Sequence, residues 1–465
     1  MKEKTLDSIF KAYDIRGKCP EELNPEFFYN LGKAYATKFK PQTVVVGHDI
    51  RPDSSIFKQS LIKGLLESGC NVVDLGEIAT EMLYFAVGEY SDIYDGGLVV
   101  TASHNPRGWN GCKMVGKRAT RIGQSSGLFD LKEIILTGTY EKVNDTPGKI
   151  SDKYIYPEFK NKILSFIKSV PTKKLNIVVD AGNGIGGKVF DYVFSSLNLN
   201  ITKMYFVPDG DFPNHIPDPM KEENVVELRK RVLDENADFG IAIDGDADRV
   251  FFIDKKGRKP DGAYTGVLLA RYLLQNSENK KIIHDPRITW PFVKEAKKLG
   301  AITFQSVAGQ SNFKQKMREE GALFGAEASS HFCYHDFYNC DSAMATIALM
   351  LQMYFEGFEL TRAVDYLFEK YPNSGEVNYS VDNAKEMLEK LEEHYKGMGA
   401  VIEHVDGLSV SFSDWRFNMR MSNTQPLVRL NVEAETVDKV VEHFKEVEGL
   451  VGSPRDNIPT LTELR

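Results

Sequence analysis

The stretch Gly96-Gly97-Leu98-Val99-Val100-Thr101-Ala102-Ser103-His104-Asn105-Pro106 decides how we expect the chain to fold. Its first five residues are glycine or apolar, which predicts a buried strand. Pro106 cannot continue a helix, so the polar residues after the strand are expected to form a loop. Loops at the ends of such strands carry chemistry in α/β folds, and Ser103 is therefore a candidate catalytic serine. An ordinary turn built from serine, asparagine and proline is the alternative.

Strands and helices alternate before this stretch. Thr43–Gly47 and Asn71–Gly76 are β-branched runs typical of buried strands. Glu26–Phe39 and Glu81–Tyr90 have helical spacing. The alternation predicts parallel strands joined by right-handed crossovers, and hence an α/β unit.

A strand that contains glycine and runs into a polar loop occurs twice more, at Gly240–Arg249 and Gly325–His331. The repetition predicts three related mixed α/β domains around a central cleft, each contributing one loop. After the linker Tyr371–Gly375, alternating strands around a charged helix predict a smaller C-terminal α+β domain with an antiparallel sheet. We expect four domains in all, at residues 1–148, 149–254, 255–370 and 371–465.

Composition narrows the class of protein. The chain has 465 residues, of which 42% are apolar and 27% are charged, with a formal net charge of −8. This charge disfavours non-specific binding to nucleic acid but leaves room for a small anionic substrate in a local positive pocket. Five scattered cysteines without CxxC pairs indicate reduced thiols in a cytoplasmic protein. We expect neither a signal peptide nor a membrane span, and a monomer or a dimer.

Three aspartates at alternate positions, Asp244, Asp246 and Asp248, follow an apolar strand. A turn at Gly245 brings the three carboxylates toward one point, where they repel one another unless a cation lies between them. Ligation by carboxylates alone favours Mg²⁺ over Ca²⁺ or Zn²⁺, and the spacing of an EF-hand is absent. Arg249 would lie beside the metal and bind a phosphate or sugar oxygen. A solvated acidic turn is the alternative.

Two further loops carry polar side chains suited to a sugar phosphate. Glu327, Ser329 and His331 alternate, so an extended backbone would point all three to one side. Carboxylate and hydroxyl suit sugar hydroxyls, and the imidazole suits proton transfer. A plain polar loop with a hydrogen-bonded histidine is the alternative here.

Arg420–Arg429 places serine, asparagine and threonine between two arginines. Such a turn forms an anion-binding concavity, and arginine adds bidentate recognition of phosphate. An ordinary Asn-x-x-Pro turn is the alternative. Ser103 does not lie in a Gly-x-Ser-x-Gly elbow, and we find no well-spaced His and Asp partners of a hydrolase triad, so Ser103 is better interpreted as a phosphoryl carrier.

These four motifs, in this order, resemble the α-D-phosphohexomutase superfamily, and the resemblance covers essentially the whole chain. Thr101–Pro106 is similar to its phosphoserine loop and Asp244–Arg249 to its metal loop. Gly325–His331 resembles its sugar-binding loop, and Arg420–Arg429 its phosphate-binding loop.

Two other segments resemble one branch of that superfamily. Ala12–Gly17 and Ile283–Arg287 are most similar to the bacterial phosphomannomutases, including enzymes that also use glucose phosphates. The resemblance implies reversible interconversion of mannose 6-phosphate and mannose 1-phosphate through a phosphoserine and a hexose 1,6-bisphosphate. A phosphoglucomutase or a phosphoglucosamine mutase is the near alternative. A metal-dependent sugar phosphatase, or a sugar-phosphate-binding protein without turnover, is the alternative from another class.

The resemblance also implies roles for individual residues. Mg²⁺ would be bound by the phosphate on Ser103 and by Asp244, Asp246 and Asp248. The residues implied in proton transfer and charge stabilisation beside Ser103 are Lys113, Arg16, Arg249 and His331. The residues implied in substrate binding are Tyr13, His104, Arg287, Gln310, Glu327, Ser329, Arg420, Ser422, Asn423, Thr424 and Arg429.

The chain departs from the superfamily pattern at two positions. Gln310 stands where many mannose-type relatives have histidine, and an amide cannot shuttle a proton. Ser330 stands where the sugar loop commonly has glycine. Both positions bear on proton transfer and on the choice of sugar.

Overall fold

The computed structural model describes residues 3–169, 174–421, 427–452 and 455. The chain forms two compact units, each of which is described by itself. One comprises Met1–Lys259 and His331–Phe358, and the other comprises Pro260–Ser330 and Glu359–Arg465.

The first unit opens with a mixed seven-stranded sheet in the order β1-β5-β4-β2-β3-β7, with β6 paired to β5. Its strands are β1 (Ile15–Lys18), β2 (Thr43–His48), β3 (Asn71–Glu77), β4 (Gly96–Val100), β5 (Trp109–Gly116), β6 (Thr120–Arg121) and β7 (Ile150–Asp152). Its helices are α1 (Glu3–Ile9), α2 (Pro25–Phe39), α3 (Ser54–Glu67), α4 (Thr80–Glu89) and α5 (Leu128–Thr137). The centre is parallel, as predicted, whereas β1 and β5 are antiparallel to their neighbours.

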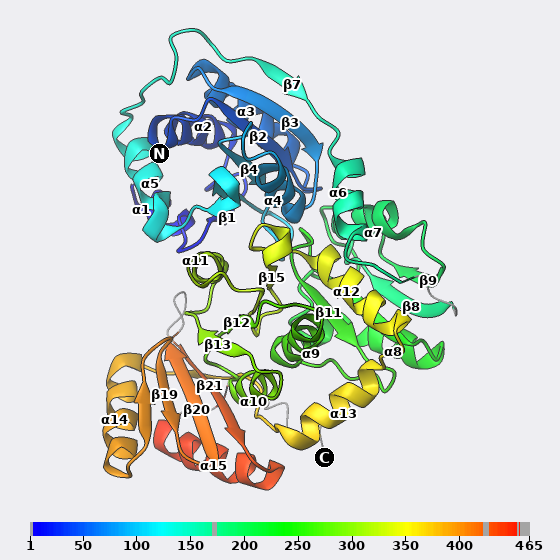
Figure 1. The fold of residues 1–465 in the computed structure, drawn as a ribbon. Helices are drawn as coiled ribbons and strands as arrows, with labels where there is room; N and C mark the ends of the chain where they lie inside the picture. The colour runs from blue at the N-terminus through cyan, green and yellow to red at the C-terminus, as the bar shows by residue number, and fades with distance from the viewer. Residues whose placement is uncertain (1–2, 170–173, 422–426, 453–454, 456–465) are drawn as a thin grey trace. The chain divides into compact units, whose positions relative to one another are not determined.

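Glycine begins β4 because helices approach both faces of the sheet there (Figure 1). A Cβ atom on Gly96 would lie 2.2 Å from the hydroxyl of Tyr35 in α2. A Cβ atom on Gly97 would lie 2.7 Å from Leu83 in α4. Successive residues of a strand point to opposite faces, so the pair of glycines lets two helices close on one buried strand. That strand leads directly to Ser103.

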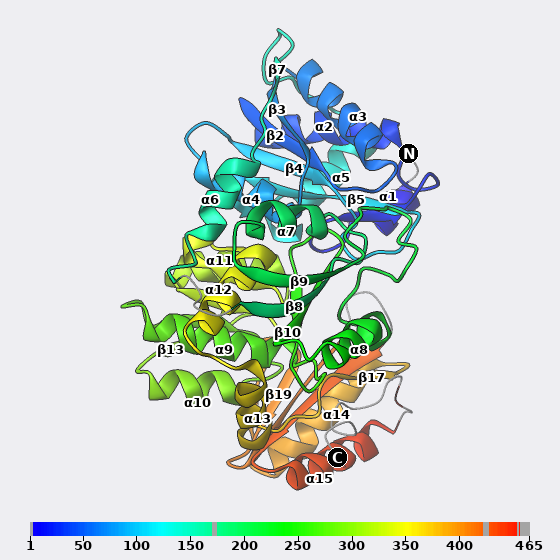
Figure 2. The ribbon, with the colours of Figure 1, turned by 90° about the vertical axis from the view of Figure 1, so that its right-hand side faces the viewer.

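The second sheet of this unit has the order β11-β10-β8-β9. Its strands are β8 (Leu175–Asp180), β9 (Leu199–Met204), β10 (Phe239–Ile243) and β11 (Val250–Ile253), with α6 (Tyr156–Leu164), α7 (Gly186–Phe194) and α8 (Val226–Asp234). Figure 2 shows α7 and α8 beside this sheet. The turn between β10 and β11 carries the three aspartates. The unit is completed by the hairpin β15 (Phe332–Tyr334) and β16 (Cys340–Asp341), and by α12 (Ala343–Phe355).

The second unit contains a parallel group in which β12 (Lys281–His284) lies between β13 (Ile302–Gln305) and β14 (Phe324–Ala326). Its helices are α9 (Gly262–Gln275), α10 (Trp290–Lys298), α11 (Gln310–Glu320) and α13 (Leu360–Lys370). Short 3₁₀ helices occur in the first unit at Lys117–Ala119, Gln124–Ser126, Glu222–Val225 and His335–Phe337.

The C-terminal part is an antiparallel sheet in the order β17-β21-β20-β19-β18. Its strands are β17 (Val377–Ser380), β18 (Val401–Glu403), β19 (Leu408–Ser411), β20 (Trp415–Met421) and β21 (Leu427–Ala434). Helices α14 (Ala384–Gly397) and α15 (Val437–Val451) pack on this sheet, drawn in orange in Figure 1. The predicted fold class is thus confirmed.

One detail of that domain differs from the prediction. Arg420–Arg429 is not a single loop, because Arg420 lies in β20 and Arg429 in β21. Among the described residues, none of the helices combines the length and the apolar character that a membrane span requires.

Candidate functional site

Ser103 follows β4 in a tight, buried turn. The hydroxyl oxygen of Thr101 accepts a hydrogen bond from the Ser103 N–H at 2.9 Å, and the Ala102 carbonyl accepts one from the Asn105 N–H at 3.0 Å. Ser103 has φ of 49°, in the left-handed region that serine seldom adopts. Such strained positions persist where the surrounding structure imposes them, often at functional sites.

Arg51, which sequence reasoning did not select, holds this turn in place. Its guanidinium donates hydrogen bonds to the carbonyl oxygens of Ser103 at 2.8 Å, Asn105 at 2.6 Å, Pro106 at 3.1 Å and Trp109 at 3.0 Å. The side chain is buried and forms an ion pair with buried Asp49, at 3.2 Å. One cation therefore organises the whole loop that carries the serine. No local pattern in the sequence distinguishes Arg51 from an exposed loop arginine.

The three predicted aspartates do converge. Asp244, Asp246 and Asp248 are all buried, and one oxygen of each lies within 4.8 Å of the others. The Ser103 hydroxyl donates to Oδ2 of Asp244 at 3.1 Å, which joins the two predicted loops. A Cβ atom at Gly245 would lie 2.4 Å from the Ser103 carbonyl oxygen, so glycine permits this close approach.

Two buried cations offset this negative charge. The Lys113 ammonium lies 2.7 Å from Oδ2 of Asp246 and also contacts Asp248, and Nε of Arg249 donates to Asp244 at 3.0 Å. Burial, with help from Asp248 and Asp246, raises the pKa of Asp244 to about 7 even though Arg249 acts to lower it. Burial lowers the pKa of Lys113, but the neighbouring aspartates outweigh it and leave that pKa above its ordinary value.

The acidic group fits a hard divalent cation. Oδ1 of Asp246 is buried and has no hydrogen-bond donor among the described residues. Its other oxygen accepts from the Thr80 hydroxyl at 2.5 Å and from Lys113. A buried carboxylate oxygen without a donor is costly unless an ion or water contacts it, and an all-oxygen ligand set suits Mg²⁺ better than softer metals. The residues at this point could therefore bind a metal ion.

Three other predicted residues lie in the same unit as Ser103. His104 places Nδ1 3.3 Å from the Ser103 oxygen, and burial and then Arg249 hold the pKa of His104 well below its ordinary value. Arg16 donates from Nη2 to Asp14 at 2.8 Å, and the Tyr13 carbonyl accepts from Arg121 at 3.1 Å.

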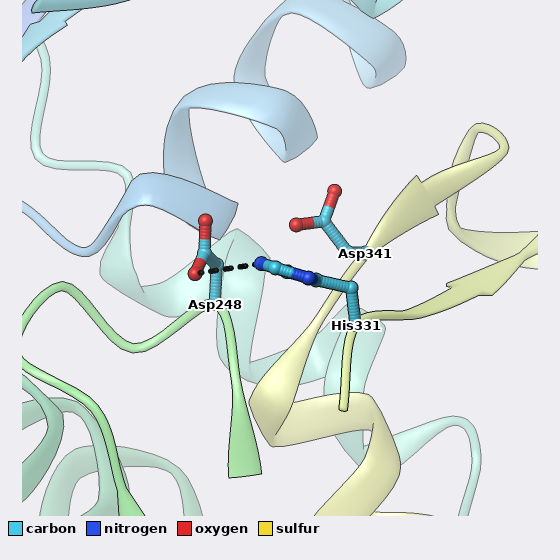
Figure 3. A group of neighbouring side chains, drawn as sticks. All are labelled: Asp248, His331 and Asp341. Carbon is cyan, nitrogen blue, oxygen red and sulfur yellow. Dashed lines mark ion pairs between the residues drawn. The ribbon is translucent and has the colours of Figure 1, made fainter. Parts of the chain in front are cut away.

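His331 lies beside the third aspartate. Its Nε2 is 3.9 Å from Oδ1 of Asp248, and Asp341 from β16 lies close to both, as Figure 3 shows. Asp341 reaches this position because the β15–β16 hairpin pairs it with Cys333, two residues after His331. Sequence reasoning missed Asp341, since only the hairpin register brings it back to the histidine.

The sugar-loop residues of the second unit are arranged differently from the prediction. The Ser330 N–H donates to the Glu327 carbonyl at 2.9 Å and Ser330 has φ of 65°, so this segment is a turn. The expectation that an extended backbone aligns Glu327, Ser329 and His331 is therefore wrong. Oε1 of Glu327 accepts from the Gly309 N–H at 3.0 Å and lies 3.4 Å from Nη2 of Arg287. Ser329 lies partly exposed within the turn.

The two arginines of the predicted phosphate loop are cross-strand neighbours in the C-terminal sheet. Arg420 pairs with Arg429 in the β20–β21 register, and both contact the carboxylate of Glu376. Ser422, Asn423 and Thr424 lie outside the described residues. Gln310 is the first residue of α11, and its side chain is likewise outside what the structure describes.

The chain matches four sequence families in succession. These are domains I, II and III (alpha/beta/alpha) of phosphoglucomutase/phosphomannomutase, at residues 7–140, 155–257 and 261–371, and the C-terminal domain of the same proteins, at residues 376–449.

Curated proteins and a solved structure agree with these matches. The chain is 39% identical to the phosphohexose mutases of Xanthomonas campestris pv. campestris over 427 residues, which covers 91% of this chain and 94% of that protein. It is 38% identical to a phosphomannomutase of Salmonella montevideo, with 96% of this chain and 99% of that protein covered. A solved phosphoglucomutase/phosphomannomutase family protein of Burkholderia thailandensis matches with a TM-score of 0.87 at 28% identity, over 97% of this chain and 99% of that one.

Proposed function

Because the chain belongs to the phosphoglucomutase/phosphomannomutase family, we propose that it interconverts mannose 6-phosphate and mannose 1-phosphate through a phosphoserine at Ser103. The chain is a phosphohexomutase, an isomerase of carbohydrate metabolism. The observation that carries the proposal is the Ser103 hydroxyl, held 3.1 Å from Asp244 at the edge of three converged aspartates.

The proposed transfer uses groups of the first unit. In the phosphorylated enzyme, a free hydroxyl of the hexose phosphate attacks phosphorus, the bond from phosphorus to the Ser103 oxygen breaks, and a bisphosphorylated sugar forms. The hydroxyl proton passes to a nearby base, for which His331 is the candidate. Lys113 and Arg249 stabilise the charge that develops on the phosphoryl oxygens. A Mg²⁺ ion bound by Asp244, Asp246 and Asp248 would supply further charge neutralisation when present.

The return half of the reaction needs a second phosphate site. The bisphosphate turns over and donates its other phosphoryl group back to Ser103, so a hexose 1,6-bisphosphate also serves as activator. We assign the non-reacting phosphate to Arg420, Ser422, Asn423, Thr424 and Arg429. We assign the sugar hydroxyls to Glu327, Ser329 and Gln310, and further substrate binding to Tyr13, His104 and Arg287. Arg16 is assigned to charge stabilisation together with Lys113 and Arg249.

The names of the similar proteins bear on the choice of sugar. The Xanthomonas relative is named for hexose phosphates in general, and the Salmonella one for mannose phosphate. We therefore expect activity on mannose phosphates, with glucose phosphates as a second substrate. A cytoplasmic location, a monomeric or dimeric state and the four domain boundaries stay predictions.

A coupled assay with the 1-phosphates of mannose, glucose and glucosamine, with Mg²⁺ and catalytic hexose 1,6-bisphosphate, tests the function. Ser103→Ala should abolish turnover with every sugar, whereas Ser60→Ala in α3 should leave turnover unchanged. Substantial activity of Ser103→Ala, at an unchanged unfolding temperature, would disprove the phosphoserine route. Release of inorganic phosphate without isomerisation would instead show a phosphatase.

A further inference from the structure

Glu376 lies between the arginines of the second unit. It immediately precedes β17, at the side of the sheet where β17 pairs with β21. Its Oε1 accepts from Nη1 of Arg429 at 2.8 Å, and its Oε2 accepts from Nη2 of Arg420 at 3.2 Å. Oε2 also lies 3.7 Å from Nη1 of Arg287. One carboxylate thus contacts three guanidinium groups, all within one unit.

This arrangement explains how two arginines can stand opposite each other. Arg420 and Arg429 are cross-strand neighbours, and like charges directly opposite on paired strands are destabilising. Burial raises the pKa of Glu376, but Arg287, Arg420 and Arg429 outweigh it and lower that pKa to about 2. Glu376 is therefore ionised at any working pH, and its charge offsets the repulsion between the two arginines.

The arginines keep donors that Glu376 does not use. Each guanidinium has five N–H donors, and the carboxylate of Glu376 accepts from Nη2 of Arg420 and from Nη1 of Arg429. The Nε–H groups of both arginines are buried and have no acceptor among the described residues. Buried donors of this kind indicate a further anion, because leaving them unsatisfied costs free energy.

We propose that Glu376 is a positioning residue of the phosphate-binding site, whose carboxylate fixes Arg420 and Arg429 in the geometry that receives the non-reacting phosphate of the substrate. The inference rests on the proposed function. Preorganised arginines lose less side-chain entropy when phosphate binds, so the gain is in affinity for the sugar phosphate. Because Glu376 also contacts Arg287, which lies 3.4 Å from Glu327, the same network extends to the sugar loop.

Steady-state kinetics of Glu376→Gln test the proposal. The amide keeps the shape of the side chain but turns an N–H donor toward one of the arginines. Arg420 and Arg429 should therefore be held less firmly. We expect KM for mannose 1-phosphate to rise about tenfold with little change in kcat, because the groups around Ser103 are untouched. Glu448→Gln is the matched control: Glu448 accepts from Arg455 at 2.7 Å and from Tyr379 elsewhere in the same domain, and its loss should leave KM unchanged. An unchanged KM in Glu376→Gln would overturn the proposal.

A double-mutant cycle separates positioning from a merely structural role. If Glu376 acts through Arg420 and Arg429, the KM of the double variant Glu376→Gln/Arg420→Ala should rise by less than the product of the two single effects, because part of the effect of Glu376 is already lost with Arg420. Multiplied effects on KM would contradict the proposal. If Glu376→Gln fails to fold, Glu376→Asp serves instead, because it keeps the charge and withdraws the carboxylate by one methylene. A raised KM in that variant supports the proposal and an unchanged KM overturns it.

Binding without turnover distinguishes this inference from the proposed function. Calorimetry with mannose 6-phosphate in a Ser103→Ala background should give weaker binding when Glu376→Gln is added. Equal affinity would refute the role of Glu376 even if the wild-type enzyme is an active mutase. Weaker binding together with an inactive wild-type enzyme would support the role of Glu376 and refute the proposed reaction.

Discussion

Replacing Arg51 by lysine should impair phosphoryl transfer without unfolding the chain. The guanidinium spans four carbonyl oxygens of the serine loop, at 2.6 to 3.1 Å, while it also neutralises Asp49. A lysine ammonium keeps the charge beside Asp49, but it is a single point and cannot replace a planar fork. It reaches one or two of the four carbonyls, so at least two charged hydrogen bonds are lost.

The expected losses of loop stability and of rate in Arg51→Lys follow from those lost hydrogen bonds. A hydrogen bond to a charged group contributes about 1.5 to 3 kcal/mol, and water can replace part of this at the half-exposed end of the loop. We expect about 2 to 4 kcal/mol of loop stability to be lost. A loop released to this extent lets the Ser103 oxygen move by about 1 Å, which costs on the order of 100-fold in rate at a reacting group.

The assay is kcat and KM of Arg51→Lys with mannose 1-phosphate, next to Lys58→Met. Lys58 is buried and forms an ion pair at 2.6 Å with the partly buried Asp74, in the same sheet domain. Lys58→Met should lower the unfolding temperature and spare kcat, whereas Arg51→Lys should lower kcat and spare KM. If folded Arg51→Lys keeps most of the wild-type kcat, Arg51 does not position Ser103.

The other predictions concern pH, metal and packing. His215 hydrogen-bonds to Asp180 at 3.0 Å and to the Ile216 carbonyl at 2.9 Å. Burial acts to lower the pKa of His215, but the hydrogen bond and the charge of Asp180 raise that pKa above 6.5. The folded state therefore holds this proton more tightly, so the stabilisation is present below about pH 6.5 and is lost as pH rises through the raised pKa. The unfolding temperature of the wild type should therefore fall more steeply toward alkaline pH than the unfolding temperature of His215→Gln. Parallel dependence of the two unfolding temperatures on pH would contradict this. Removal of metal with EDTA should lower the unfolding temperature of wild type but not of Asp246→Asn, and an equal response in both would exclude Asp246 as a ligand. A methyl group at Gly64 would lie 2.1 Å from a carbonyl oxygen of α2, so Gly64→Ala should cost about 1 to 3 kcal/mol in chemical unfolding, whereas Gly397→Ala, with open space around it, should cost little.

The central α/β elements were predictable because their signals are local. Apolar β-branched runs and glycine pairs predict β2 and β4, and the alternate aspartates predict the turn after β10. The turn predicted at Arg420–Arg429 leaves out the end of strand β20, although Trp415, Phe417 and Met419 alternate with polar residues at the period of a strand. That alternation was a usable signal, and it would have placed Arg420 on a strand rather than in a loop.

The sequence by itself determined which residue types occupy the ends of the predicted strands, and hence the serine, the acidic triplet and the family that they resemble. Only the tertiary structure decided which buried charges meet: Arg51 with four carbonyls more than fifty residues away, Asp341 with His331, and Glu376 with Arg420 and Arg429. The physical reason is that periodicity reports burial of one face of a local element, whereas a buried ion pair depends on where distant backbone segments come together. An arginine in a loop has the same local pattern whether it faces water or holds a catalytic turn.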